Sequence, residues 1–495
     1  MVIRFTRKKG RAILVMLVIV VLEGLFSTHF LFYSYNSEIA LRCVSAICLS
    51  AFIVEYIVWW RLTGELISTY SVFFLALFLF CTGQCIGWGT GMNLGALDVW
   101  NATEGGLDKS WLTKGVIYSM LGTAFFHIGA IISYSEKNNV KTEVPREYVT
   151  SMYKNMGKLM LLIIIPAFLA KTYQSIVAVA AGGYLAFYRV NSSRSYLGTL
   201  LTIVSDWYQP CCLILLIGNR ESKIKRSLII LLMLIDVIAS LYVGGRSNAV
   251  MTMLGIILAY HYMIKPIKVK QFLIISLLAY LFMGMLNGMI YTRGVSGRSL
   301  RDLLVLMSPT GQNVLGDFIG GLGWNITSIT WTMILVPSTY PFRFGLSYIA
   351  ALTSWIPSFF FGGKAYHPST LYASLSSWLQ NALRRTSGPG YTIIAEAYIN
   401  FSWFGIFFLA IEGFFVAKII NRVSRKRCSD DMITSTMQIM FIMVVMKALI
   451  RDSMSSVIRD IVFTLLPMYF ILYFYIINNY KSAESDNEDR NINMV

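Results

Sequence analysis

Runs of about twenty apolar residues recur along the whole chain, and they restrict its fold more than any other feature. The interior of a lipid bilayer offers no hydrogen-bond partners to the backbone, so apolar segments of this length cross it as α-helices. Of the 495 residues, 56% are hydrophobic and 14% are charged, and no stretch has the composition of a separate soluble domain. The sequence therefore predicts an all-α polytopic membrane protein whose residues 1–495 form a single integral membrane domain.

Twelve of these runs are long enough to cross a bilayer as helices. The predicted spans lie at approximately residues 12–33, 39–60, 66–88, 115–133, 157–179, 197–218, 227–243, 247–264, 271–291, 391–417, 433–450 and 457–477. The first run follows a basic segment and resembles a signal peptide, but it is long and has no small-residue cleavage site. We therefore expect it to be retained as the first membrane helix.

Basic residues are shared unevenly between the connections on the two sides of the predicted membrane. The connections that contain residues 137–158, 220–226, 265–270 and 418–427 are rich in lysine and arginine, and the connections between them hold few. The positive-inside rule places the rich connections and both termini in the cytoplasm. The same rule accounts for most of the net charge of +17, so nucleic acid is not expected as a partner. The acidic tail at 481–495 is predicted to be a disordered cytoplasmic end.

The stretch at 292–390, between the ninth and tenth predicted spans, differs from the membrane helices around it. It holds four of the eleven tryptophans and six of the eleven prolines. Its basic residues are Arg293, Arg298, Arg301, Arg343, Lys364, Arg384 and Arg385, and its acidic residues are Asp302 and Asp317. Long connections of this kind are often binding loops or lids. We predict a large loop on the outer side that forms the catalytic face, with short re-entrant or interfacial helices at Asn325–Pro337 and Leu346–Phe361.

Arginines also gather at predicted helix ends on the outer side. They are Arg246, Arg293, Arg298, Arg301, Arg451 and Arg459. The guanidinium group stays charged in proteins and offers forked donors, which suits a diphosphate ligand. An interfacial arginine can instead extend toward lipid headgroups. As a set, on the side expected to be poorer in basic residues, these arginines predict an anionic ligand.

Other charged residues lie within or beside the predicted spans. The pairs at 451–452 and 459–460 are both Arg-Asp, and they share a face if one helix runs through both. Ion pairs that neutralise charge in the membrane are the alternative role for such residues. Lys171, Asp206 and Asp236 are further ionisable residues near membrane depth, and the sequence assigns them no partners.

Two outer residues are candidates for proton transfer. His367 is the only one of the four histidines in the 292–390 stretch, and imidazole is a common proton acceptor near neutral pH. Glu396 lies just inside the tenth predicted span, where a carboxylate is costly unless it is paired or faces a cavity. The alternatives are a solvated loop histidine and a structural ion pair between Glu396 and an arginine. We predict that His367 is the proton acceptor.

Several motifs are absent from the sequence. There is no Gly-x-x-x-x-Gly-Lys-Ser/Thr phosphate loop and no His-Glu-x-x-His pair, and the seven cysteines lack the spacing of a metal site. We therefore expect no metal, no cofactor and no direct coupling to ATP.

Two motifs and the topology resemble the Wzy-type polymerases of O-antigen and capsule synthesis. Gly244-Gly-Arg-Ser-Asn248 opens one predicted membrane helix, and Gly390-Tyr-Thr-Ile-Ile-Ala-Glu-Ala-Tyr-Ile-Asn-Phe-Ser-Trp-Phe-Gly405 opens another. The arrangement of about twelve spans with one dominant outer loop late in the chain is similar over nearly the whole length. One family pattern is missing, because no outer arginine is followed by glycine after ten intervening residues.

The resemblance implies an activity, a location and partners. The activity is polymerisation of undecaprenyl-pyrophosphate-linked oligosaccharide repeat units at the periplasmic face of the bacterial inner membrane, by an enzyme with a GT-C-like glycosyltransferase architecture. The implied partners are membrane lipid, a chain-length regulator and a flippase. Arg246 and the group Arg293, Arg298 and Arg301 correspond by position to outer arginines that the family uses, and Glu396 occupies the acidic place in the last motif.

Two other functions are compatible with the sequence. A flippase or similar transporter of lipid-linked oligosaccharides is expected to have repeated halves, but the long loop has no counterpart in the first six spans. An O-antigen ligase would share the fold and the basic loop, and the sequence separates it poorly from a polymerase.

Overall fold

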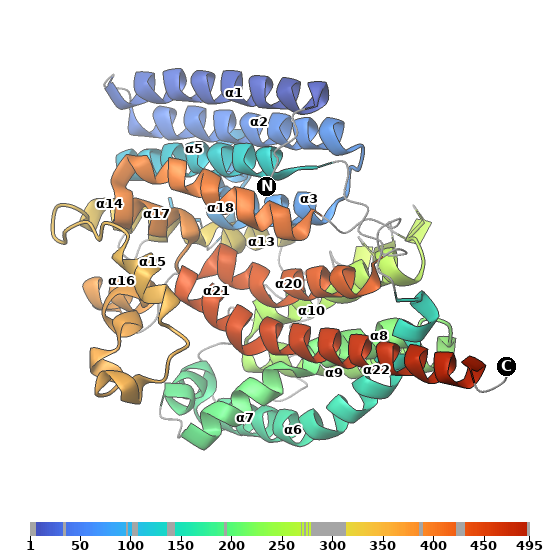
Figure 1. The fold of residues 1–495 in the computed structure, drawn as a ribbon. Helices are drawn as coiled ribbons and strands as arrows, with labels where there is room; N and C mark the ends of the chain where they lie inside the picture. Colours follow the sequence, from blue (N-terminus) through green and yellow to red (C-terminus); the bar gives the residue numbers. More distant parts are fainter. Residues whose placement is uncertain are drawn as a thin grey trace. The chain divides into compact units, whose positions relative to one another are not determined.

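The computed structural model describes residues 6–32, 36–95, 98–100, 107–135, 144–192, 196–268, 313–385, 390–421 and 431–492, with a few residues between 270 and 278. Every regular element in these ranges is a helix, and they contain no strand (Figure 1). The predicted all-α class is confirmed.

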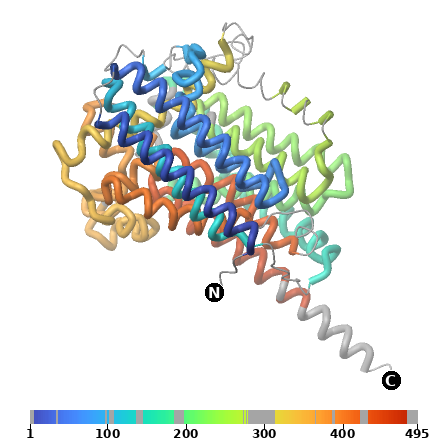
Figure 2. Tube along the Cα trace, turned by 90° about the horizontal axis from the view of Figure 1, so that it is seen from above, coloured from blue at the N-terminus to red at the C-terminus, as the bar shows by residue number. Residues whose placement is uncertain are grey.

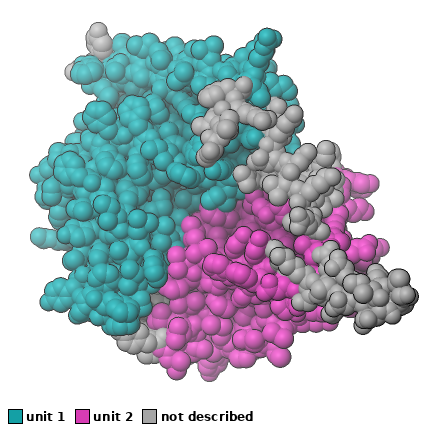
Figure 3. All heavy atoms as spheres, viewed as in Figure 1, with its two compact units in different colours: residues 1–137, 309–421, 446–459 teal, residues 138–308, 422–445, 460–495 magenta. Residues whose placement is uncertain are grey.

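The chain forms two compact units, which Figure 3 distinguishes by colour. Unit 1 comprises residues 1–137, 309–421 and 446–459, and unit 2 comprises residues 138–308, 422–445 and 460–495. Candidate membrane helices occur in both units. That residues 1–495 act as a single membrane domain stays a prediction.

The predicted spans agree well with the helices. In the described part of the chain, ten helices are long and apolar enough to cross a membrane. The third predicted span is a bent pair, α3 (Thr69–Thr82) and α4 (Gln84–Thr90), which meet at 69° and bring the number to eleven. The remaining predicted span, the ninth, at 271–291, lies largely outside the described residues. The prediction of a polytopic membrane protein with about twelve spans is confirmed to this extent.

Unit 1 is built around one central helix, α5 (Lys109–Ser133), most of which is buried. The hairpin of α1 (Arg7–Phe32) and α2 (Ser37–Thr63) runs along it, and α1 exposes most of its apolar residues (Figures 1 and 2). The other helices of unit 1 are α3, α4, α13 (Val314–Leu322), α14 (Ile326–Leu335), α15 (Leu346–Leu352), α16 (Leu375–Ala382), α17 (Ile393–Phe401) and α18 (Gly405–Ile420), with the end of α20 (Met432–Arg451) and most of α21 (Met454–Asp460).

The helices α5 and α18 pack closely because glycines line their contact. A side chain at Gly129 would overlap the carbonyl oxygen of Ala410, and one at Gly413 would overlap the carbonyl oxygen of Phe126. Small residues of this kind let membrane helices approach each other at short range, where van der Waals contact replaces the hydrophobic effect. The pair α5 and α18 therefore forms a rigid centre that carries α17 at its end.

Unit 1 has two distinct ends. At the first, which we call the Lys9 end, α1 begins while α5 and α18 finish: Lys9 Nζ donates to the carbonyl oxygens of Ile132 at 2.5 Å and Tyr134 at 3.0 Å. Thr69 Oγ1, at the start of α3, donates to the carbonyl oxygen of Ile420 at 2.6 Å. The starts of α1 and α3 therefore lie beside the ends of α5 and α18, as expected of membrane spans that run in opposite directions.

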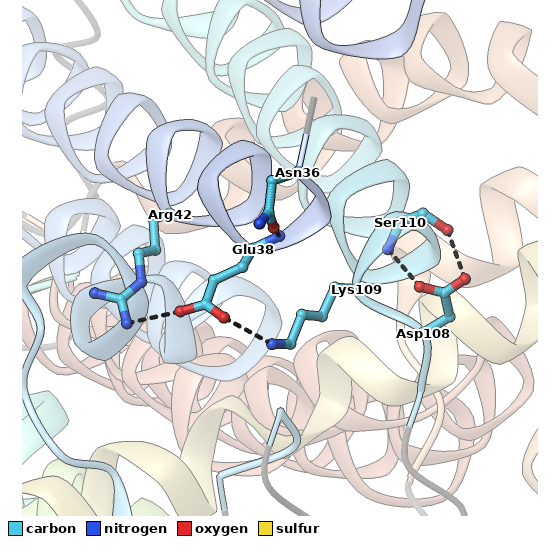
Figure 4. Close-up of polar contacts among 6 residues, drawn as sticks. All are labelled: Asn36, Glu38, Arg42, Asp108, Lys109 and Ser110. Atoms are coloured by element: carbon cyan, nitrogen blue, oxygen red, sulfur yellow. Dashed lines mark hydrogen bonds and ion pairs between the residues drawn. The ribbon is translucent and has the colours of Figure 1, made fainter. Parts of the chain in front are cut away.

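At the opposite end, which we call the Lys109 end, α2 and α5 begin. Glu38 accepts hydrogen bonds from Arg42 and Lys109, each at 3.1 Å, and so ties the first turn of α2 to that of α5 (Figure 4). Asn36 and Asp108 cap the same two helices by accepting from the backbone N–H groups of Glu38 and Ser110 (Figure 4). Such caps satisfy N–H groups that the helix itself leaves unpaired.

The described part of the 292–390 stretch adds short helices to the Lys109 end. α14 is nearly fully buried and packs against α5 and α17, while Gln84 Nε2 donates to the carbonyl oxygen of Gly320 in α13 at 2.9 Å. α15 (Leu346–Leu352) packs against α17, and α16 (Leu375–Ala382) packs against α14 (Figure 1). Both apolar segments predicted within this stretch contain short helices, α14 and α15. Their placement in a large periplasmic loop stays a prediction.

Unit 2 contains the first part of α20, up to Val445, and the remaining described spans. They are α6 (Arg146–Ser192, interrupted at Gly182 and Gly183), α7 (Tyr196–Asp206), α8 (Tyr208–Gly218), α9 (Lys223–Val243), α10 (Arg246–Ala259) with the π-turn η2 (Tyr260–Ile264), and η8 (Ile461–Leu465) with α22 (Leu466–Ile492). Gly244 ends α9 with a φ of 92°, which lets α10 begin at Arg246. α22 is helical to Ile492, into the tail 481–495 for which the sequence predicts disorder.

Candidate active site

Glu396, the acidic residue of the Gly390–Gly405 motif, is the centre of a buried hydrogen-bond network in unit 1. Its side chain is 0% exposed. Ser347 Oγ donates to Glu396 Oε1, and the backbone N–H of Met454 donates to Oε2, each at 2.7 Å. The carboxylate therefore links α17 to α15 and to the start of α21. It accepts from these two donors. No arginine in the described part of the chain forms the ion pair with Glu396 that was the expected structural alternative.

Asn400 completes this network one helical turn further along α17. Its Nδ2 donates to Ser347 Oγ at 2.7 Å and to the carbonyl oxygen of Glu396 at 2.8 Å, and its Oδ1 accepts from the backbone N–H of Gly345 at 2.9 Å. Gly345 has a φ of 86° and packs against Phe401, so a larger residue there would be strained. The start of α15 is thus fixed on α17.

His367 is buried within the loop between α15 and α16. Its Nε2 lies 2.9 Å from the carbonyl oxygen of Ile356, which can only accept, so this nitrogen carries a proton. Its Nδ1 accepts from the backbone N–H of Ser369 at 3.1 Å and lies 2.6 Å from Ser369 Oγ. The ring is 4% exposed and lies edge-on to Phe361. The arrangement holds a neutral imidazole with its lone pair on Nδ1, beside a hydroxyl group.

The His367 segment is joined to the break between α20 and α21. Ser369–Ala373 forms a π-turn, η6, immediately after His367. The carbonyl oxygen of Ala373 accepts from Ser453 Oγ at 3.0 Å and from Ser455 Oγ at 3.3 Å. Two acceptors therefore hold the break: Glu396 binds the backbone of Met454, and Ala373 binds the hydroxyls of Ser453 and Ser455.

Arg451 ends α20 directly before this break. Its guanidinium carbon lies 5.3 Å from the ring centroid of Phe80 in α3, which is cation–π geometry. A side chain at Gly390 would overlap the carbonyl oxygen of Arg451, so the beginning of the Gly390–Gly405 motif packs against the backbone of this arginine. The chain thus brings a cation, the motif and the Glu396 network into one part of unit 1.

An unpaired amide lies beside the same glycine. Asn325 is 2% exposed, and its Nδ2 has no hydrogen-bond partner among the described residues. A side chain at Gly390 would lie within contact distance of Asn325 Oδ1. A buried donor without a partner is costly unless a ligand or water meets it. Asn325 is therefore a candidate for ligand contact next to Arg451.

Arg343 is a second cation in this part of unit 1. Its guanidinium donates to the carbonyl oxygen of Tyr372 and lies 5.3 Å from the ring centroid of Trp378. Burial lowers the pKa of Arg343, and the nearby Tyr391 and Glu396 partly offset this effect. The group stays a cation at neutral pH because the pKa of arginine begins far above that range.

Comparison with known protein families decides what kind of protein carries this site. The family model described as "O-antigen polysaccharide polymerase Wzy" matches residues 13–482, which is nearly the whole chain. The chain belongs to this family. No curated protein and no solved structure matches it. The resemblance seen in the two motifs is confirmed, and the chain is a multi-pass membrane protein of a polysaccharide polymerase family. A GT-C-like architecture stays a prediction.

The structure places only some of the predicted site residues of this Wzy-family chain. His367, Glu396 and Arg451 all belong to unit 1 and are connected through the break that follows Arg451. Arg246 is the first residue of α10, in the helix-opening position that its motif predicts, and its side chain is not described. Arg293, Arg298 and Arg301 lie outside the described residues. Their assignment to pyrophosphate binding stays a prediction.

The other charged residues singled out in the sequence have structural roles. Lys171 pairs with Asp206 at 2.5 Å, and Gln209 Nε2 donates to Asp236 at 2.5 Å. The Arg-Asp pairs at 451–452 and 459–460 do not lie on one continuous helix, because the helix breaks at Asp452 and Ser453. Asp452 instead accepts from Ser456 Oγ at 2.7 Å and stabilises the start of α21.

Several residues of this Wzy-family site were not selected from the sequence. They are Asn325, Arg343, Ser347, Ser369 and Asn400. Asn400 had a detectable signal, because it lies four positions after Glu396 in an apolar helix and so shares its face. Ser369 follows His367-Pro368 closely, where a hydroxyl can reach the imidazole. Ser347 and Asn325 come from distant segments and had no local signal.

Proposed function

We propose that this protein polymerises undecaprenyl-pyrophosphate-linked oligosaccharide repeat units into O-antigen or capsular polysaccharide at the periplasmic face of the inner membrane. Membership of the Wzy family supports the polymerase activity. The positive-inside pattern supports a periplasmic Lys109 end and cytoplasmic termini. The lipid-linked glycan is the substrate, and a flippase that delivers it and a regulator of chain length are the expected partners.

One observation carries the catalytic part of the proposal. The carbonyl oxygen of Ala373 accepts from Ser453 and Ser455, so the segment that begins at His367 is fixed to the residues that follow Arg451. A proton acceptor and a cation are thereby held in a defined relation, although they come from distant parts of the sequence. Transfer from a lipid diphosphate to a sugar hydroxyl requires these two groups.

The reaction transfers a glycan from its lipid diphosphate to a hydroxyl group of another chain. The acceptor oxygen attacks the anomeric carbon, the bond from that carbon to the diphosphate oxygen breaks, and lipid diphosphate leaves with the electron pair. Arg451 stabilises the developing negative charge, with Asn325 Nδ2 as a further donor. His367 Nδ1 takes the proton of the acceptor hydroxyl, which displaces both the hydroxyl and the backbone N–H of Ser369 from the lone pair.

Glu396 has a different role in this proposal. Both of its oxygens accept hydrogen bonds from protein donors, one on α15 and one at the start of α21, and its side chain is fully buried. It is a positioning residue, which holds the start of α21 and therefore the break that follows Arg451. Arg246, Arg293, Arg298 and Arg301 are proposed as further pyrophosphate ligands.

The function is tested by deletion of the gene and analysis of the surface glycan. A polymerase mutant retains a single attached repeat unit and loses the long chains. Loss of all attached antigen would instead indicate a ligase or a flippase. A second test reconstitutes the purified protein with lipid-pyrophosphate-linked repeats and follows the appearance of longer glycans. Arg246→Lys and Arg293→Lys should each lose most of this activity if a forked contact to diphosphate is required.

A further inference from the structure

The residues between Phe344 and Tyr372 form an apolar surface that the proposed chemistry does not use. Its exposed side chains, which we call the aromatic platform, range from 42% to 77% exposed. They are Phe344, Leu346, Ile349, Leu352, Trp355, Phe359, Phe360, Tyr366, Leu371 and Tyr372. The sequence places one lysine and no arginine, aspartate or glutamate in this stretch. Many large exposed apolar side chains in one short stretch indicate a binding face or a membrane contact.

The opposite face of the platform is already occupied. Ala350 and Ala351 of α15 and Ala373 of η6 form a small core against Met454 and Ile458 of α21. The helical turns η4 (Ser358–Phe361) and η5 (Lys364–Tyr366) join α15 and η6 in one packed group. The platform is therefore fixed from beneath, and its exposed side chains need a different partner.

The platform is continuous with a surface that faces lipid. Tyr348 of α15 stacks on Phe401 and lies 4.5 Å from Phe408, and the backbone N–H of Phe344 donates to the carbonyl oxygen of Asn400. These contacts place the platform beside the start of α18. The exposed face of α18 carries Phe407, Ile411 and Phe415, and the exposed Phe404 directly precedes it. The segment Ile393–Ile420, which contains α18, is long and apolar enough to cross the membrane.

The length of α18 fixes the depth of the platform. From Ile420, at the Lys9 end, to Gly405 the helix α18 rises about 22 Å, and the hydrocarbon core of a bilayer is about 30 Å thick. Lys418 marks the first boundary, since it lies in the last turn of α18. The start of α18 and the platform beside it therefore lie past the bilayer midplane, in the leaflet on the Lys109 side. Aromatic side chains in a leaflet are favoured toward its headgroup boundary.

We propose that the aromatic platform docks on the lipid bilayer at the headgroup boundary of the leaflet on the Lys109 side. The occupant is lipid, because the platform lies beside the exposed apolar face of α18, has almost no charge and is rich in the aromatic side chains that are favoured at the headgroup boundary. This proposal is independent of the proposed chemistry. It places the His367 segment at the membrane surface, at the depth where a lipid-linked diphosphate carries its charge.

The test measures the depth of single fluorescent labels in lipid nanodiscs. Cys43 and Cys428 are first replaced by serine, because Cys43 is exposed and would take up label. Phe360→Cys and Ile349→Cys report on the platform, Ile411→Cys reports on the middle of α18, and Ser338→Cys is an exposed polar control at the Lys109 end. Quenchers are brominated lipids, with bromine near the headgroup or near the chain end, and iodide in water.

The expected result is a defined order of quenching. Labels at 360 and 349 should be quenched several-fold more by bromine near the headgroup than by bromine near the chain end, and the label at 411 should show the reverse. The label at 338 should respond to iodide alone. Platform labels that behave like the label at 338 would overturn the proposal, as would labels reached by neither quencher, which would mean that protein covers the platform. No substrate is needed, so failure here leaves the proposed function untouched.

Discussion

The two ends of unit 1 use polar side chains for different purposes. At the Lys9 end, Lys9 and Thr69 donate to the last carbonyl oxygens of α5 and α18, and these contacts only complete helix termini. At the Lys109 end there are such caps as well, but the chain adds α13, α14, α15 and α16 and buries Glu396 and His367 among them. A buried carboxylate in a membrane protein is costly, so the hydrogen-bond network that joins Glu396 to distant segments indicates that the function lies at the Lys109 end.

The largest effect is expected from Glu396→Ala. The change leaves Ser347 Oγ and the N–H of Met454 without an acceptor, at about 1–3 kcal/mol for each buried donor. Protein abundance, thermal stability and polymer formation should all fall strongly. Glu396→Gln keeps one acceptor oxygen and should lose less stability. Glu412→Gln is the matched control for Glu396→Gln, because Glu412 is a buried carboxylate on α18 that interacts with Tyr348 and does not contact α21. This variant should be tolerated. Equal losses of stability at both positions would show that the Glu396 network matters no more than any other buried carboxylate.

The next effect is expected from His367→Ala. If Nδ1 accepts the proton of the sugar hydroxyl, the variant should bind lipid-linked substrate and form no polymer. Ser369→Ala should retain activity within a few-fold, because the serine hydroxyl only occupies the lone pair until the acceptor arrives. Polymer formation and substrate binding are measured on the same purified protein. An active His367→Ala enzyme beside a well-folded, inactive Glu396→Gln enzyme would reverse the assignment and make the carboxylate the base.

Arg451→Lys should have a smaller effect that is confined to activity. Lysine keeps the charge but loses the forked donors and the flat stacking surface above Phe80, so polymer formation should fall about tenfold or more at normal protein abundance. Arg42→Lys is the control at the same end, because its pair with Glu38 is exposed and contributes little. Full activity of Arg451→Lys would show that charge alone is sufficient there.

The sequence predicted the spans well because each span has a local signal. Apolar runs such as those of α1, α2 and α5 are recognisable without knowledge of their neighbours. The bend between α3 and α4 was not predicted. At the bend, Gly83 lies so close to the carbonyl oxygen of Leu79 that a side chain would overlap it. Glycine in a predicted span indicates that a bend is allowed, but tertiary packing decides whether one forms.

The site was predictable only in part, because its contacts join distant segments. His367 and Glu396 were selected as isolated residues, and nothing local to either one indicates Ile356, Ser347 or Met454 as its partner. Those partners define what each group can do. Ile356 fixes the tautomer of the imidazole, and Met454 occupies one oxygen of the carboxylate. The chemical class of a residue follows from sequence, whereas its role depends on the groups that surround it.

The smallest effect is expected at the Lys9 end, from Lys9→Met. Two carbonyl oxygens at the end of α5 lose their cationic donor, which should lower the free energy of unfolding by about 1–2 kcal/mol. Lys8→Met is the matched control, because Lys8 is exposed on the same turn and should leave the thermal stability unchanged. Polymer formation per folded molecule and the distribution of chain lengths should be normal in both variants, since neither contact reaches the residues around Glu396. A loss of polymer formation in Lys9→Met at normal stability would mean that the Lys9 end also contributes to function, and the contrast between the two ends would no longer hold.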